Sequence, residues 1–136
     1  MSDRFSLDGR AAIITGGGTG IGRGAALVLA RYGADIALAG RRREPLESTA
    51  KEIEALGRRV VVAPTDVTVP EQCQQLVDLT LKELGRVDIL VNNAGGAQTR
   101  SLMKWTDEQW HQVVALNLGS VCHCSSVHFI SDRERV

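Results

Sequence analysis

The amino-acid sequence predicts an α/β fold whose core is a doubly wound parallel sheet. Short apolar segments alternate along the chain with longer segments that carry apolar residues at helical spacing. A glycine-rich turn joins the first apolar segment to the first helical one. This alternation implies right-handed strand–helix–strand crossovers and a sheet that helices cover on both faces. We expect the strand order 3-2-1-4.

The strands are predicted from short apolar or β-branched segments, each ended by glycine, proline or asparagine: 11–15, 35–39, 60–63 and 87–91. The helices are predicted from apolar residues at helical spacing. They are one from the glycine turn to about residue 32, then 44–56, 70–84, and a last one that begins near Thr106, where Gln109 completes a capping box. Phe5 and Leu7 are expected to pack before the first strand.

Composition places the chain among soluble, single-domain proteins. Of its 136 residues, 43% are hydrophobic and 24% charged, and 16 basic residues balance 16 acidic ones. This balance gives no electrostatic reason to expect a nucleic-acid or membrane partner. Neither a secretory signal nor an apolar segment of about 18 residues is visible. Three cysteines are a sparse, odd set that suits a reducing compartment, so we expect a cytoplasmic protein.

The glycine-rich turn is the strongest functional signal. Residues 11–24 read AAIITGGGTGIGRG, which is a strand, a glycine turn and the start of a helix. Glycines allow the backbone to approach a diphosphate closely, and free N–H groups at the helix start face the anion. An ordinary turn is the alternative, but the flanking strand and helix favour nucleotide binding.

Each of the other strands also ends in polar or glycine residues. Arg41 follows the second strand, Asp66 and Val67 follow the third, and 92–95 (Asn-Asn-Ala-Gly) follow the fourth. The carboxyl ends of parallel strands meet at one edge of the sheet, where doubly wound folds bind ligands. We therefore expect these positions to lie in one site.

Together, these four features resemble the short-chain dehydrogenase/reductase family, as typified by 3-oxoacyl-carrier-protein reductases and bacterial glucose dehydrogenases. The similarity covers residues 5 to about 118. It implies a Rossmann-type fold and an NAD(P)-dependent oxidoreductase that transfers hydride between the cofactor and a small carbonyl or hydroxyl substrate. It also implies that the full-length form is a homo-oligomer.

The resemblance assigns three groups of cofactor-binding residues. Asp66 would bind the adenine amino group with Val67 beside the ring; a helix cap is the alternative reading of Asp66, and the two roles are compatible. Asn92, Ala94 and Gly95 would approach the adenosine ribose, with a plain loop as the alternative. The diphosphate would be lined by the glycine turn, namely Gly16, Gly18, Thr19, Gly20, Ile21 and the motif's last glycine, Gly22.

Arg41 favours NADP over NAD. The end of the second strand reads Ala-Gly-Arg-Arg and lacks the carboxylate that would accept hydrogen bonds from the ribose 2′-hydroxyl of NAD. A guanidinium suits a 2′-phosphate. A solvated surface arginine is the alternative, and Thr19 stands where many NADP-preferring relatives have a basic residue. NAD stays open as a cofactor.

Asn117 matches the asparagine of the family's Asn-Ser-Tyr-Lys catalytic set, where it supports a water in the proton relay. The other members are absent: the one tyrosine, Tyr32, falls in the first helix, Lys104 is the last lysine, and Ser125 and Ser126 follow Asn117 too closely. We therefore expect residues 1–118 to be the amino-terminal part of the domain, lacking strands 5–7 and inactive alone. Residues 119–136 show no helical stripe and are expected to be an atypical tail, out of frame or truncated.

Cys122, His123, Cys124 and His128 lack the spacing of a structural zinc site, and no metal site is expected. Two other functions stay open beside a truncated oxidoreductase. One is a noncatalytic dinucleotide-binding module. The other, within enzymes, is an enoyl- or dienoyl-thioester reductase. The open edge of the fourth strand predicts that the chain is unstable or associates.

Overall fold

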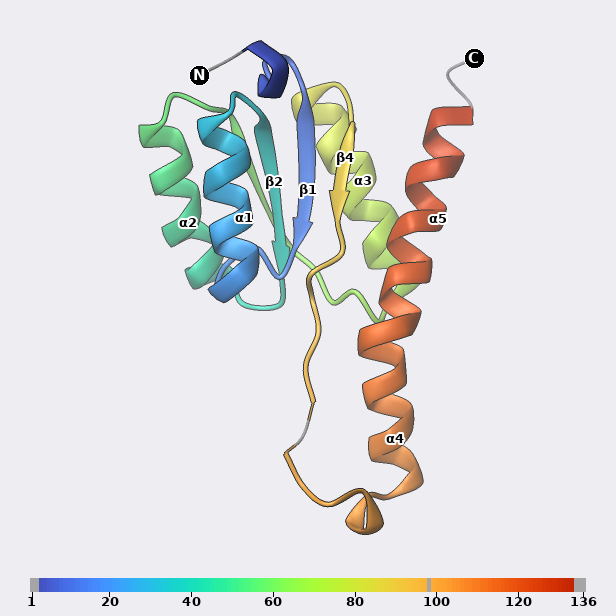
Figure 1. Ribbon diagram of the computed structural model, residues 1–136. Coiled ribbons are helices and arrows are strands. Elements are labelled where there is room, and N and C mark those ends of the chain that lie inside the picture. Colours follow the sequence, from blue (N-terminus) through green and yellow to red (C-terminus); the bar gives the residue numbers. More distant parts are fainter. Residues whose placement is uncertain (1–2, 98, 134–136) are drawn as a thin grey trace.

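A computed structural model describes residues 3–97 and 99–133 of the chain. Within them lie a four-stranded sheet and five α-helices (Figure 1). The strands are β1 (Ala11–Thr15), β2 (Asp35–Gly40), β3 (Val60–Pro64) and β4 (Ile89–Val91). The helices are α1 (Gly20–Arg31), α2 (Arg43–Ala55), α3 (Pro70–Leu84), α4 (Asp107–Val114) and α5 (Ser120–Arg133). Short 3-10 turns cover Asp3–Phe5 and Leu102–Lys104, and a π-helical turn, Ala115–Gly119, joins α4 to α5.

The sheet is parallel throughout, and its order β3-β2-β1-β4 confirms the predicted one. In the register, Ile13 of β1 lies opposite Ala37 of β2 and Leu90 of β4. The fourth strand was predicted too long, because it begins at Ile89 and not at 87. The side chain of Asp88 accepts the N–H of Ala11 and thereby takes the place of a backbone acceptor on β4.

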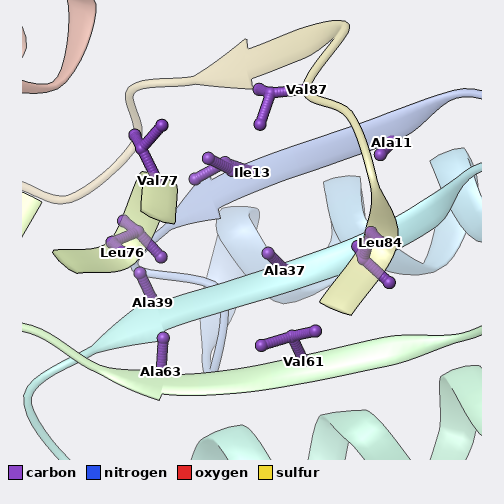
Figure 2. Packing of buried hydrophobic residues seen from close by; sticks show 10 residues of the cluster. All are labelled: Ala11, Ile13, Ala37, Ala39, Val61, Ala63, Leu76, Val77, Leu84 and Val87. Atoms are coloured by element: carbon purple, nitrogen blue, oxygen red, sulfur yellow. The ribbon is translucent and has the colours of Figure 1, made fainter. Parts of the chain in front are cut away.

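Alternate residues of the strands point to opposite faces, and each face has its own helices. Helices α1 and α2 cover one face, and α3 and α5 cover the other (Figure 1). On the α3 face, Ile13, Ala37 and Val61 pack against Leu76 and Val77 (Figure 2). This two-sided burial is what a parallel sheet requires, and it explains why β1 and β2 are apolar along nearly their whole length.

The segment before β1 differs in part from expectation. Leu7 packs against the α1 and α2 side of the sheet, and its N–H bonds to the carbonyl of Tyr32. Phe5 does not pack as predicted, because it lies in a 3-10 turn with 68% of its surface exposed.

Residues 119–133 are helical although their sequence shows no helical stripe. Helix α5 lies along α3, where Cys124 and Val127 join Cys73 in one apolar cluster. A single narrow contact of this kind stabilises a helix without producing a broad apolar face. In the described part of the chain, no helix has the length and apolar character needed to cross a membrane.

Candidate nucleotide-binding cleft

A cleft of about 1160 Å³ opens at the carboxyl ends of the strands. The segments that follow all four strands line it, together with residues of α4 and the π-helical turn. This volume slightly exceeds the range of roughly 300–1,000 Å³ usual for small-molecule sites. The structure brings ten of the predicted site residues to its wall: Gly16, Gly18, Thr19, Gly20, Ile21, Arg41, Asp66, Val67, Ala94 and Gly95.

The glycine turn between β1 and α1 has a shape that only glycine allows. Gly16 and Gly20 have φ angles of +67° and +54°. Gly22 does not line the cleft, because it lies beneath the turn, where a Cβ atom would collide with the Gly16 carbonyl and the Asn93 side chain. A Cβ atom on Gly18 would come within 3.0 Å of Pro45. The turn is therefore pressed against both α2 and the end of β4.

Helix α1 begins at this turn with uncapped N–H groups. The side chain of Thr19 makes no capping hydrogen bond, and the first turn of α1 contains no acidic residue. The first N–H groups of a helix lack intrahelical partners and, with the helix dipole, favour an anion. The structure thus fits a phosphate group at this point of the cleft.

Two contacts hold α2 against the glycine turn. The hydroxyl of Thr49, which is fully buried, lies 3.3 Å from the carbonyl oxygen of Gly18 and 3.1 Å from that of Pro45. Arg23 of α1 makes a forked ion pair with Glu52 of α2, with its shortest N···O distance at 2.6 Å. The start of α2, which carries the arginine run, is therefore fixed relative to the turn.

The three consecutive arginines have different surroundings. Arg41 and Arg42 are exposed and line the cleft, whereas Arg43 lies outside it and pairs with Glu47 at 3.4 Å. Among the described residues, no ion pair includes Arg41. Its guanidinium is thus available to an anion in the cleft.

Asp66 has one carboxylate oxygen engaged and the other available. Its Oδ1 accepts the backbone N–H of Thr68 at 2.9 Å and the Thr68 hydroxyl at 2.6 Å. These bonds, helped by Arg41, outweigh burial and lower the pKa of Asp66, so the group is ionised at neutral pH. The alternative reading of Asp66 as a helix cap is wrong, since Val69 occupies the N-cap of α3. In the described structure Oδ2 has no hydrogen-bond donor, which leaves it able to accept one from a ligand.

Asn93, to which the sequence analysis gave no role of its own within 92–95, fastens the end of β4 to the end of β1. Its N–H and that of Ala94 donate to Thr15 Oγ1, each at 3.0 Å, and its Nδ2 donates to the Thr15 carbonyl. Asn92 does not line the cleft; it is exposed and donates to Ser125 Oγ at 3.2 Å. Residues that alternate along a strand face opposite ways, so the sequence indicates that the two asparagines differ, but it does not say which of them faces the glycine turn.

Asn117 lies in the π-helical turn and holds the loop that follows β4. Its Nδ2 donates to the carbonyls of Gly96 and Val113, at 2.7 and 2.9 Å, and its Oδ1 accepts the N–H of Gly96. Asn117 does not line the cleft, but it lies directly behind Gly95. A Cβ atom added to Gly95 would come within 2.7 Å of the Asn117 Oδ1 atom. Its part in a proton relay stays a prediction.

The remaining chemistry-bearing residues lie apart from the cleft. Tyr32 caps the carboxyl end of α1, on the side of the sheet where the strands begin and therefore away from the cleft. Lys104 lies in the 3-10 turn before α4. Among the described residues no group of three or more His, Cys, Asp or Glu side chains could hold a metal ion. The side chain of His128, one of the ligands considered above, falls outside the described residues.

The sequence and the structure match one family of proteins. A family model described as short chain dehydrogenase matches residues 10–131. The chain is 37% identical to an NADP-dependent mannitol dehydrogenase of Alternaria alternata, covering 99% of this chain and 52% of that protein. It is 38% identical to 2-dehydro-3-deoxy-D-gluconate 5-dehydrogenase of Escherichia coli, covering 93% and 51%.

Solved structures agree with these sequence matches. A 7α-hydroxysteroid dehydrogenase complexed with NADH and 7-oxo glycochenodeoxycholic acid superposes with a TM-score of 0.88 at 34% identity, covering 93% of this chain and 49% of that one. The chain spans about half the length of the curated relatives it matches.

Proposed function

The chain belongs to the short-chain dehydrogenase family, and we propose that it forms the amino-terminal part of the cofactor-binding domain of an NADP(H)-dependent oxidoreductase. The family match to residue 131 and the packing of α5 on α3 favour a part that extends past residue 118. The glycine turn, Arg41 and Asp66 carry the proposal, because they meet in one cleft at the carboxyl ends of the strands.

Each of these groups has a distinct role in the proposal. The N–H groups at the start of α1 bind the diphosphate, and the free Oδ2 of Asp66 accepts the adenine amino group with Val67 beside the ring. Asn92, Ala94 and Gly95 stay proposed near the adenosine ribose, the last two from the wall of the cleft. When bound, the nicotinamide supplies or accepts the hydride that the family's chemistry requires.

Arg41 supports NADP as the cofactor. It is exposed, lines the cleft, and is free of the ion pairs that engage other arginines of the described chain. Asp66, the acidic residue among those that line the cleft, has its Oδ1 committed to Thr68. A 2′-phosphate would meet a positive charge at the end of β2, whereas the 2′-hydroxyl of NAD would find no carboxylate after Ala39 and Gly40.

Fluorescence titration with NADPH and NADH tests the cofactor proposal. Charge-assisted hydrogen bonds are worth about 1.5–3 kcal/mol, so Arg41→Ala should weaken NADPH binding by about 10-fold or more and leave NADH binding unchanged. Arg43→Ala is the matched control, because it removes the same charge two residues away and outside the cleft. Equal effects of the two variants, or tighter binding of NADH than of NADPH, would contradict the proposal.

The oxidoreductase activity is a proposal for the whole protein. The family's proton transfer needs a tyrosine in Tyr-x-x-x-Lys, and Tyr32 is far from the cleft, so this chain is proposed to bind cofactor without turnover. Asn117 is proposed to support the relay from the π-helical turn. A noncatalytic dinucleotide-binding module, or an enoyl- or dienoyl-thioester reductase, is the alternative. Sequencing the source DNA beyond this chain distinguishes these hypotheses. A reading frame that continues into a strand ending in serine and then a Tyr-x-x-x-Lys motif would support the oxidoreductase. A source without such a reading frame would support the noncatalytic binding module.

We also propose a reducing, cytoplasmic location and a homo-oligomeric full-length form. Cys73, Cys122 and Cys124 are all free thiols, as expected in a reducing compartment. Leu102, Met103 and Leu118 expose large apolar surfaces around α4, which favours burial against another copy. Cell fractionation tests the location, and light scattering of the full-length protein tests the assembly.

A further inference from the structure

Two buried thiols face one another away from the cleft. Cys73 lies in the first turns of α3 and Cys124 lies within α5, and their Sγ atoms are 3.3 Å apart. Both are almost fully buried, with 0% and 2% of their surface exposed. The thiol of Cys124 donates to Cys73 Sγ, and that of Cys73 donates to the carbonyl of Val67 at 3.5 Å. This pair takes no part in the site described above.

We infer that Cys73 and Cys124 form a reversible disulfide that fastens α5 to α3 when the protein meets a peroxide. A disulfide bond is about 2.05 Å long, so the two sulfurs need to approach each other by little more than about 1 Å. Val67, Leu90 and Leu116 pack around them and keep them facing each other. The inference rests on this geometry alone and does not depend on the proposed cofactor function.

The hydrogen bond between the thiols identifies the nucleophile. Burial raises the pKa of both groups, that of Cys124 to about 12, but the bond from Cys124 opposes this increase at Cys73. The charge of Asp66 adds to the increase at Cys73. Cys73 is therefore the more acidic thiol of the pair and attacks first. Since the thiolate is scarce at neutral pH, we expect the pair to react with peroxide slowly.

The chemistry balances with hydrogen peroxide as the oxidant. The Cys73 thiolate attacks one peroxide oxygen, the O–O bond breaks, and the departing hydroxide takes the proton that Cys73 lost, giving water and a sulfenic acid. Cys124 sulfur then attacks Cys73 sulfur, and the S–S bond forms as hydroxide leaves and takes the Cys124 proton. In total, two thiols lose two electrons and two protons, and one peroxide becomes two waters.

The disulfide would strengthen the attachment of α5 to α3. It would close a loop between residues 51 positions apart in the sequence, which lowers the entropy of the unfolded chain. The cluster around the pair includes Val67 and Leu116, which also line the cleft, so the bond would fasten the layer behind the cleft. We expect the Tm of the oxidised chain to rise by about 5–15 °C.

Peptide mapping under non-reducing conditions tests the inference on the full 136-residue chain. After treatment with hydrogen peroxide, we expect peptides containing Cys73 and Cys124 to be joined within one chain, with the loss of two hydrogens. A thiol reductant should separate them and reverse the change in Tm. The exposed Cys122 lies two residues from Cys124 on the same helix, which makes Cys122→Ser the matched control. This variant should form the bond as the natural chain does.

Three results would overturn the inference. The first is oxidation of Cys122 alone, either as an adduct or as a link between chains. The second is conversion of Cys73 and Cys124 to separate sulfinic acids without a link. The third is a linked chain whose Tm equals that of the reduced chain, because α5 would then not be fastened. Cys73→Ser and Cys124→Ser should each abolish the link, and the mapping of the natural chain decides the matter even if these variants fold poorly.

Discussion

The part of the chain that ends with β3 and the part that begins with β4 differ sharply in how they are stabilised. Every residue of β1, and all but the last of β2, is buried between two layers of helices. In β4, by contrast, all three residues are only half-buried, and α4 has no buried residue. Met103, which precedes α4, has 93% of its surface exposed.

This difference shows that the two parts carry different shares of the site. The first part supplies most of the apolar core, which Leu76, Val77 and Leu84 of α3 complete on one face, and it holds the glycine turn and Arg41 on rigid supports. The second part completes the wall of the cleft and is held by a smaller apolar cluster around Cys124 together with polar contacts. Two of these contacts join it to β1: Thr15 at the carboxyl end of the strand and Asp88 at the amino end. Substitutions at these points and within each part test the comparison.

The largest effect is expected from Gly22→Ala, within the first part. A Cβ atom would collide with the backbone carbonyl of Gly16 and with the side chain of Asn93, whose Nδ2 donates to the carbonyls of Thr15 and Gly16. We expect a loss of about 3 kcal/mol in the free energy of unfolding and loss of NADPH binding. Urea denaturation and fluorescence titration measure the two. Gly24→Ala is the control on the same helix, because its Cβ meets nothing within 4 Å and should gain about 0.5–1 kcal/mol. Equal behaviour of the two variants would contradict the prediction.

Thr15→Val should weaken the attachment between the two parts of the chain at the cleft. It removes the acceptor of the Asn93 and Ala94 N–H groups and leaves both without a partner. We expect a loss of about 2 kcal/mol in the free energy of unfolding together with weaker NADPH binding. Thr15→Ser keeps the hydroxyl and should retain both properties. A valine variant that binds NADPH as tightly as the natural chain would show that this joint does not hold the cleft.

Asp88→Asn should change the dependence of stability on acid at the other end of β1. Burial alone would raise the pKa of Asp88, but hydrogen bonds from Arg86, the Ala11 N–H and Arg10 outweigh it and lower the pKa to about 2. A lowered pKa in the folded state stabilises the fold above the ordinary value of 3.8, and this contribution is lost as the pH falls toward about 2. We expect a contribution of about 1–2 kcal/mol at neutral pH, since both arginines are half exposed.

Urea denaturation midpoints from about pH 7 down to about pH 2 measure this contribution. The natural chain should keep its advantage over Asp88→Asn well above pH 3.8 and lose it as the pH falls below 3.8 toward about 2. Asp35 and Asp66, whose pKa values are also lowered, remain in both proteins and contribute to the acid dependence that they share. A constant difference between the two at every pH would refute the assignment.

The smallest effect on folding is expected from Met103→Gln, in the second part. Because the side chain is almost fully exposed, the free energy of unfolding should change by less than about 0.5 kcal/mol. The variant should nevertheless reduce self-association measured by light scattering, since it removes part of the exposed apolar surface. Val28→Gln, on the half-exposed face of α1, is the control and should leave association unchanged. A natural chain that is a clean, cooperatively unfolding monomer would contradict the predicted association.

The sequence predicted most of the fold because its signals are local. The helix bounds for α1, α2 and α3 and the capping box at Thr106 and Gln109 follow from residues near one another in the chain, and the strand order follows from the fold class that this local alternation indicates. Two features depended on distant partners and were missed or misplaced. Helix α5 follows from its packing on α3, and the late start of β4 follows from the bond between Asp88 and Ala11.

The same distinction applies to the site. The sequence by itself determined that the glycine turn, Arg41 and Asp66 follow successive strands. Because parallel strands bring their carboxyl ends to one edge of the sheet, these residues were expected to meet in one site. Only the tertiary structure decided that Asn93 and not Asn92 faces the glycine turn, that Arg43 turns away to Glu47, and that two cysteines 51 residues apart meet. These outcomes depend on which side chains adjacent elements bring together, and a linear pattern does not contain that information.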